Sequence, residues 1–332
     1  MTDPDPAADG RPAPASHGRQ SGVQPVTRAD VAAAAVRVDG HVRRTPVLTL
    51  EADALGRSAP VVAKLDLLQP TGSFKVRGAT SLLTGVAVPD AGVVAASGGN
   101  FGLAVAYAAR RLGHRAIIFV PDSSPPAKLR PLADLGAEVH VVPGYYADAL
   151  AAADEHVATT GALRAHAYDQ AEVVAGQGTA TAELLVEHPD VDTLLVAVGG
   201  GGLLAGAAAV VGDDVRLIGV ETHGTPALTA ARAAGHPVDV EVGGLAASSL
   251  GARRLGDLAW AAQPWVDDAL LVTEDEVAQA QRDLWAAARL VAEPGGATAL
   301  AALTSGRYVP APGERVAVLV CGGNVDPATV VG

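Results

Sequence analysis

The sequence predicts an α/β protein in which parallel strands alternate with crossover helices. From residue 26 onward, short apolar runs alternate with alanine-rich stretches of helical character, the pattern expected of such a fold. Three apolar runs are each followed by a glycine-rich turn, at residues 97–100, 199–202 and 321–324. Because open parallel sheets bind ligands at the carboxyl ends of their strands, these turns predict one shared crevice.

The individual elements follow from local pattern. The expected strands are residues 61–65, 93–96, 116–120, 138–142, 194–198, 217–220 and 316–320. Helices are expected at residues 29–38, 101–112 and 145–159, the second of them closed by Gly113. The longest helix is expected at residues 274–291. Thr273 and Glu276 have the spacing of a capping box at its start, in which each side chain satisfies a free backbone amide.

Composition excludes several classes of protein. The chain has 332 residues, is 49% hydrophobic and carries a formal net charge of -12, so it can bury a sizeable core and lacks the basic character of a nucleic-acid-binding protein. The long apolar run at residues 194–211 is interrupted by four glycines, which argues against a membrane span. Residues 1–24 have no signal-peptide core and are expected to be a disordered tail. With a single cysteine, Cys321, a cytoplasmic location is expected.

Lysine is rare in this chain. Of 24 basic residues only Lys64, Lys75 and Lys128 are lysines, so surface charge is otherwise supplied by arginine. A lysine, unlike an arginine, can lose its proton and act as a nucleophile or form a Schiff base. Lys75 follows a Gly72-Ser73 turn at the start of a helical stretch, where the helix dipole and partial burial favour the neutral amine. The alternative is an ordinary solvated lysine.

Two of the glycine-rich turns are candidate anion sites. The four glycines 199–202 stand between a strand and an apolar helix, so backbone amides and a helix N-terminus can converge on a phosphate. The alternative is a merely tight turn. The turn at residues 97–100 adds a hydroxyl and a carboxamide to its free amides and suits a substrate carboxylate, although Ser and Asn are also ordinary helix caps.

Several motifs together resemble one known family. The run Thr71-Gly72-Ser73-Phe74-Lys75-Val76-Arg77-Gly78-Ala79, the asparagine turn, the tetraglycine and the terminal Gly-Gly-Asn resemble, in this order, the fold type II pyridoxal-phosphate enzymes. Residues 175–179 and 273–276 extend the match. Within the family the chain is most similar to serine/threonine dehydratases and serine racemases. The resemblance implies the tryptophan synthase β-like fold, with two open, twisted, mostly parallel sheets flanked by helices.

The resemblance also implies the site residues. Lys75 holds pyridoxal 5'-phosphate as a Schiff base and, with Ser97, is catalytic. Phe74 packs on one face of the pyridine ring, Gly244 lies near the other face, and Asn100 bonds the phenolic oxygen. The remaining cofactor-binding residues are Gly199, Gly200, Gly201, Gly202 and Leu203 at the phosphate, Cys321 at the pyridine nitrogen, and Glu293 and Asn324. The substrate carboxylate is held by Ser97, Gly98, Gly99 and Asn100.

The chain departs from the family pattern in two places. Phe101 follows the asparagine where these dehydratases usually carry histidine, which changes the polarity of the carboxylate end. Relatives that bind a divalent cation use a glutamate after a strand and an aspartate six positions later. Here Glu221 matches the glutamate, but Ala227 takes the place of the aspartate. Hard cations bind to several oxygen ligands, and one carboxylate supplies too few. Glu221 is therefore a candidate ligand, but no metal is predicted.

The implied reaction is dehydration of a β-hydroxy amino acid, such as L-threonine or L-serine, to a 2-oxo acid and ammonia. Lys75 is the base, and racemases of this family add a serine where this chain has Gly98. Tyr168, at a position where dehydratases carry an aromatic residue, favours the same reaction. The alternatives are a hydroxyaspartate dehydratase using Arg253 and Arg254, an amino-acid racemase, a β-replacement synthase of the sulfhydrylase type, and a catalytically silent amino-acid binder.

The resemblance also predicts the domain organisation. Residues 25–87 together with 166–332 are expected to form a large cofactor-binding domain, and residues 88–165 a small mobile domain that closes over the cofactor. The expected partner is a small amino-acid substrate. A homodimer is expected because it is the commonest symmetric assembly.

Overall fold

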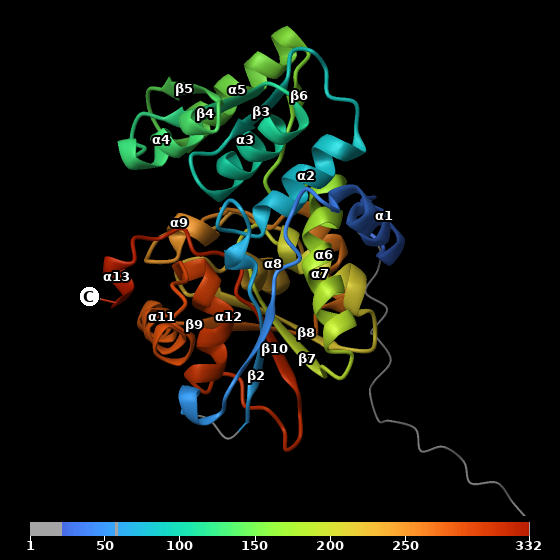
Figure 1. Ribbon diagram of the computed structural model, residues 1–332, viewed down its shortest axis with the longest axis vertical. Coiled ribbons are helices and arrows are strands. Elements are labelled where there is room, and N and C mark those ends of the chain that lie inside the picture. The colour runs from blue at the N-terminus through green and yellow to red at the C-terminus, as the bar shows by residue number, and fades with distance from the viewer. Residues whose placement is uncertain (1–21, 57–58, 332) are drawn as a thin grey trace, which may run out of the picture.

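The structure, a computed structural model, describes residues 22–56 and 59–331 and contains two sheets (Figure 1). The larger sheet has six strands in the order β1-β2-β10-β7-β8-β9, and the smaller has four in the order β5-β4-β3-β6. Among these strands only β1 pairs antiparallel, with β2; all other pairs are parallel. The predicted α/β class with two mostly parallel sheets is confirmed. The predicted disordered tail falls, up to residue 21, outside the described residues.

The strands of the two sheets are as follows. The larger sheet is formed by β1 (Val47–Leu50), β2 (Val61–Lys64), β7 (Thr193–Ala197), β8 (Arg216–Thr222), β9 (Asp268–Val272) and β10 (Val316–Leu319). The smaller sheet is formed by β3 (Val93–Ala96), β4 (Ala116–Pro121), β5 (Glu138–Val142) and β6 (Leu163–Arg164). All seven expected strands are present, while β1, β6 and β9 were not expected. These three are edge strands, and their pairing depends on neighbours distant in the sequence.

Thirteen α-helices and three short 3₁₀ turns connect the strands within the described ranges. The helices are α1 (Arg28–Val38), α2 (Lys75–Gly85), α3 (Asn100–Leu112), α4 (Pro126–Asp134), α5 (Tyr146–Thr160), α6 (Ala171–Glu187), α7 (Gly202–Val211), α8 (Ala227–Ala234), α9 (Ala247–Leu250), α10 (Asp257–Ala261), α11 (Glu274–Ala288), α12 (Pro294–Thr304) and α13 (Ala328–Val331). The 3₁₀ turns are η1 (Asp53–Leu55), η2 (Asp66–Leu68) and η3 (Gln263–Trp265).

The expectation that the longest helix is the one beginning at residue 274 is wrong. Helix α6 has 17 residues, whereas α11 has 15 and ends at Ala288. It ends early because Arg289 takes a left-handed conformation (φ 57°) that stops the helix. The capping box at its start is confirmed, since Glu276 N donates to Thr273 Oγ1 (3.2 Å) and Thr273 N to Glu276 Oε2 (2.7 Å).

The strands alternate their side chains between two cores on opposite faces of each sheet. In the large sheet, Leu194 and Val196 face the core under α1, α6 and α7, while Leu195 faces the core under α11 and α12. In the small sheet, Val93 faces the core of α2 and α3, and Val94 faces α5. Figure 1 shows the small sheet above the large one, with α2 lying between them. No described helix is long and apolar enough to cross a membrane.

Candidate active site

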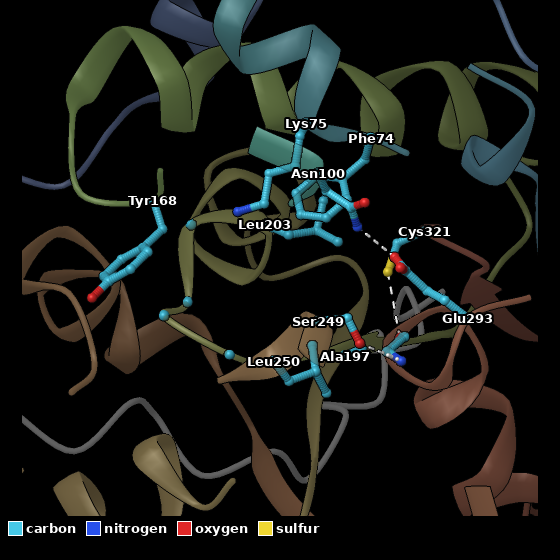
Figure 2. A pocket seen from close by; sticks show the side chains of 15 residues that line it. Phe74, Lys75, Asn100, Tyr168, Ala197, Leu203, Ser249, Leu250, Glu293 and Cys321 are labelled. Atoms are coloured by element: carbon cyan, nitrogen blue, oxygen red, sulfur yellow. Dashed lines mark hydrogen bonds between the residues drawn. The ribbon is translucent and has the colours of Figure 1, made fainter. Parts of the chain in front are cut away.

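A pocket lies where both sheets present the carboxyl ends of their strands. The space inside it, including the part open to solvent, is about 460 Å³. Figure 2 shows the side chains that converge on it from α2, α3, the end of β7 and the segment after β10. The lining residues are Phe74, Lys75, Asn100, Tyr168, Ala197, Gly199, Gly200, Gly201, Gly202, Leu203, Ser249, Leu250, Glu293, Gly295 and Cys321.

Lys75 is the first residue of α2 and extends its amine into this pocket (Figure 2). Its Nζ donates a hydrogen bond to the Ala167 carbonyl oxygen (2.9 Å) and lies 4.9 Å from the centre of the Phe74 ring and 5.9 Å from that of Phe101. Burial lowers the pKa of Lys75 from its usual 10.5 to about 8, against the opposing effect of Glu293. Near pH 8 a large fraction of this amine is therefore neutral and nucleophilic.

The four glycines form a close-packed turn between β7 and α7. A Cβ atom on Gly200 would overlap the Tyr168 ring, and one on Gly202 would lie 2.7 Å from the Tyr168 carbonyl oxygen. Gly201 has φ +87°, which disfavours any other residue there, and Gly199 has the Leu250 backbone within 3.0 Å of its Cβ direction. Packing therefore requires glycine at 200, 201 and 202 and leaves little room for a larger residue at 199.

The same turn offers free hydrogen-bond donors. Among the described residues, the backbone N–H groups of 199–203 donate to no protein acceptor, as expected at the start of helix α7. These amides border the pocket and lie at a helix N-terminus, where the helix dipole favours negative charge. The turn can therefore hold a phosphate.

Cys321 lines the pocket two residues after the end of β10 (Figure 2). The side chain is buried, its Sγ donates to the Gly295 carbonyl oxygen (3.5 Å), and its own carbonyl oxygen accepts from Phe74 N (2.9 Å). Burial raises the pKa of the Cys321 thiol, with Glu293 adding to the effect, so the sulfur stays protonated. A neutral thiol is thus fixed beside Phe74.

Asn100, Glu293 and Asn324 form a chain of hydrogen bonds at one side of the pocket. Asn100 Nδ2 donates to Glu293 Oε1 (2.6 Å), and Asn324 Nδ2 donates to Asn100 Oδ1 (2.7 Å) and to the Thr71 carbonyl oxygen (2.8 Å). Asn100 and Glu293 line the pocket, whereas Asn324 lies behind Asn100 and does not.

Ser97, Gly98 and Gly99 border the site without lining the pocket. They lead directly into Asn100, which does line it, and Ser97 Oγ accepts only a long bond from Gly99 N (3.4 Å). The N–H groups of Gly98 and Asn100 donate to no acceptor among the described residues. The predicted carboxylate turn is therefore next to the pocket and retains free donors.

Gly244, expected near the second face of a bound ring, is not among the residues lining the pocket. Its Cβ direction is filled by the Glu274 side chain at the start of α11, and Glu274 Oε2 also accepts from Ala246 N (3.0 Å). Ser249 and Leu250, which follow this segment, line the pocket instead. No sequence signal pointed to these two residues or to Ala197, because each is brought there by packing.

Glu221, the candidate cation ligand, caps a helix. Its Oε1 accepts from Leu228 N (2.6 Å), and its Oε2 accepts from the N and Oγ1 of Thr229 (both 2.8 Å), at the start of α8. The side chain is fully buried, and burial raises the pKa of Glu221 to about 7. The described residues contain no group of three or more His, Cys, Asp or Glu side chains arranged to hold a metal ion.

Comparison with known proteins gives a consistent result. The family model of pyridoxal-phosphate dependent enzymes matches residues 38–322. The chain is 37% identical over 300 residues to the L-threonine ammonia-lyase of Geobacter sulfurreducens, covering 89% of this chain and 74% of that protein.

Solved structures show the same relationship. The maize serine racemase superposes with a TM-score of 0.86 and 28% identity, covering 92% of this chain and 95% of that one. The T.th. threonine deaminase superposes with a TM-score of 0.84 and 33% identity, covering 90% of this chain and 99% of that one. The predicted resemblance is confirmed.

Proposed function

The chain belongs to the pyridoxal-phosphate dependent enzymes, and we propose that it is a dehydratase that converts a β-hydroxy amino acid, L-threonine or L-serine, to a 2-oxo acid and ammonia. The observation that carries the proposal is the site's one-sidedness. Lys75 supplies a base from the start of α2, whereas among the residues that lie away from it in Figure 2, Ala197, Ser249 and Leu250, the one hydroxyl is already hydrogen-bonded. The names of the similar L-threonine ammonia-lyase and threonine deaminase support the same reaction.

The residues of the pocket fit the cofactor of this family. The free amides of 199–203 would hold its phosphate, Phe74 and Leu203 would pack against its ring, and the Cys321 thiol would face the ring nitrogen. The Lys75 amine, with its lowered pKa, would attach it. When bound, pyridoxal phosphate withdraws electrons from the α-carbon of an attached amino acid. A neutral thiol at the nitrogen moderates that withdrawal.

Lys75 is placed to remove the α-proton. Its amine reaches into the pocket from the start of α2, and the lowered pKa makes it a base that works near pH 8. The Phe74 and Phe101 rings close to Nζ reduce its exposure to water. The Ala167 carbonyl oxygen holds the amine in place by accepting its hydrogen bond.

The wall away from Lys75 contains Ser249, Leu250 and Ala197 (Figure 2). Ser249 is the hydroxyl on this wall, but its Oγ accepts from Gly295 N (2.9 Å) and donates to the Ala246 carbonyl oxygen (3.4 Å). A hydroxyl engaged in both directions is poorly suited to exchange a proton with substrate. Gly98 has no side chain to do so either. Elimination is therefore favoured over racemisation.

The substrate carboxylate is proposed to bind the turn at residues 97–100. The free N–H groups of Gly98 and Asn100 stand at the N-terminus of α3, where the helix dipole favours an anion. Ser97 Oγ adds a donor. Phe101, the buried apolar residue that follows this turn, offers no charge to a second carboxylate, which favours threonine over hydroxyaspartate.

The test is an assay of 2-oxo acid and ammonia over a panel of serine, threonine and 3-hydroxyaspartate isomers, with the Lys75→Ala variant as control. Product from L-threonine or L-serine without an added nucleophile is expected. Product only with sulfide or a thiol would assign β-replacement, and inverted amino acid without 2-oxo acid would assign racemisation. Bound cofactor without any product would leave an amino-acid binder.

Three expectations remain proposals. Residues 88–165, which contain the small sheet, are proposed to move relative to the rest of the chain on substrate binding. A homodimer is proposed as the assembly, to be checked by light scattering of the purified protein. Glu221 is proposed only as a candidate cation ligand, because its carboxylate oxygens already cap α8.

A further inference from the structure

Asn100, Glu293 and Asn324 come from distant parts of the chain and meet at the edge of the cofactor pocket. Asn100 begins α3 beside the small sheet, Glu293 precedes α12, and Asn324 follows β10 of the large sheet. We propose that Glu293 and Asn324 are positioning residues that lock the Asn100 carboxamide in one orientation, so that one of its N–H groups is presented to an oxygen of pyridoxal phosphate.

The chemistry of the three groups fixes the direction of the chain. Asn100 donates from its Nδ2 to Glu293 Oε1 (2.6 Å; Figure 2), so the nitrogen side of its carboxamide is turned towards Glu293. The Asn100 Oδ1 then faces the opposite way and needs a donor, which is Asn324 Nδ2 (2.7 Å). Asn324 cannot flip without loss, because its Nδ2 also donates to the Thr71 carbonyl oxygen (2.8 Å).

The glycines of two motifs make room for this chain of hydrogen bonds. A Cβ atom on Gly322 would overlap Glu293 Oε1, and a Cβ atom on Gly72 would overlap Asn324 Oδ1. Gly72 also has φ +72°, a conformation that suits glycine. The glycines that precede Lys75 and follow Cys321 therefore serve the positioning of Glu293 and Asn324.

The result is an amide with one donor left over. Asn100 Nδ2 carries two hydrogens, and among the described residues only Glu293 accepts from it. Asn100 lines the pocket, so the second N–H is available to an acceptor oxygen of the cofactor. An amide held from both ends loses little conformational freedom when it binds, which strengthens the contact.

The test is a double-mutant cycle read out as the dissociation constant of pyridoxal phosphate, measured by titrating cofactor-free protein and following tryptophan fluorescence. Asn324→Ala is expected to raise this constant about 10-fold in the otherwise unchanged protein, as for loss of one hydrogen bond. In the Asn100→Ala background the same change is expected to have less than about a twofold effect, because Asn324 acts through Asn100. Glu293→Ala is expected to behave in the same way.

Equal effects of Asn324→Ala in the two backgrounds would overturn the proposal, since they would show a general role through Thr71. The proposal would also be overturned if Asn324→Ala alone changed the dissociation constant of pyridoxal phosphate by less than about twofold. Gln279→Ala, which removes an exposed amide hydrogen-bonded to Asp283, is the matched control and should leave the constant unchanged. Far-UV circular dichroism checks folding, and Asn100→Ser replaces Asn100→Ala if the latter does not fold. The inference rests on the cofactor of the proposed function and not on its reaction. If the effect of Asn324→Ala depends on Asn100 but the protein forms no 2-oxo acid, only the proposed dehydratase reaction is refuted.

Discussion

Replacing Glu183 by glutamine tests the buried ion cluster that anchors the start of α2. Glu183 on α6 accepts from Lys64 Nζ (2.6 Å) and from both terminal nitrogens of Arg77 (2.7 and 2.8 Å). Arg77 also binds both oxygens of Asp66, and the Lys64 and Arg77 side chains are fully buried. Arg77 lies two residues after Lys75, so the cluster supports the helix that carries the reactive amine.

The expected magnitude follows from the charge balance. The cluster holds two cations and two carboxylates, so Glu183→Gln leaves one buried positive charge uncompensated. Breaking a buried pair in this way costs about 3–5 kcal/mol of the free energy of unfolding. Glu187, one turn further along α6, pairs with Arg44 at a similar distance (2.8 Å), but the Arg44 side chain is 57% exposed. Glu187→Gln should cost only about 0–1 kcal/mol.

The assay is urea unfolding followed by tryptophan fluorescence and far-UV circular dichroism. With a slope of about 3 kcal/mol per molar urea, Glu183→Gln should lower the midpoint by about 1–1.7 M and Glu187→Gln by about 0.3 M or less. Equal shifts for the two variants would refute the claim that burial of the cationic partners determines the cost. A shift below about 0.3 M for Glu183→Gln would show that the cluster does not stabilise the fold.

Three further predictions concern the pocket. Borohydride reduction of the cofactor-loaded protein should place a single pyridoxyl group on Lys75, as peptide mass spectrometry would show, and the rate at which the protein binds the cofactor should rise as pH increases through about 8, where the Lys75 amine loses its proton. Labelling at another lysine, or a binding rate that does not change across this pH range, would contradict this prediction. Gly200→Ala should weaken pyridoxal phosphate binding by at least about 10-fold, because the new Cβ atom would displace the Tyr168 ring and shift the glycine turn at residues 199–202. Adding Tyr168→Ala should recover part of the lost affinity in the same titration, and no recovery would mean that the clash is not with Tyr168. The Cys321 thiol should react slowly with iodoacetamide at about pH 8 in the folded protein and rapidly in urea, because burial raises its pKa; fast labelling of the folded protein would show that the thiol is not buried and protonated. The Cys321→Ser variant should keep kcat within about threefold of the unchanged protein, since the serine hydroxyl is also neutral.

Local sequence pattern was sufficient to predict seven of the ten strands that the structure describes, and the resemblance carried by the motifs predicted the cofactor family. The seven expected strands are all present, because short apolar runs, three of them followed by glycine-rich turns, are typical of buried parallel strands. Lys75 and the glycines 199–202 also stood out in the sequence, and both line the pocket. Their identity depends on properties of the residue itself: an amine that can lose its proton, and a backbone without a Cβ atom.

The tertiary structure alone decided which residues meet. Glu293 accepts a hydrogen bond from Asn100, which lies 193 positions away in the sequence. Tyr168 packs against the glycines of the turn at residues 199–202, and Glu221 caps α8. Ser249 lines the pocket instead of Gly244 for the same reason. Sequence pattern determines which side chains a segment offers and which conformation it prefers, because those depend on neighbours along the chain. Burial, the lowered pKa of Lys75 and the orientation of an amide depend on partners that only folding brings within a few ångströms.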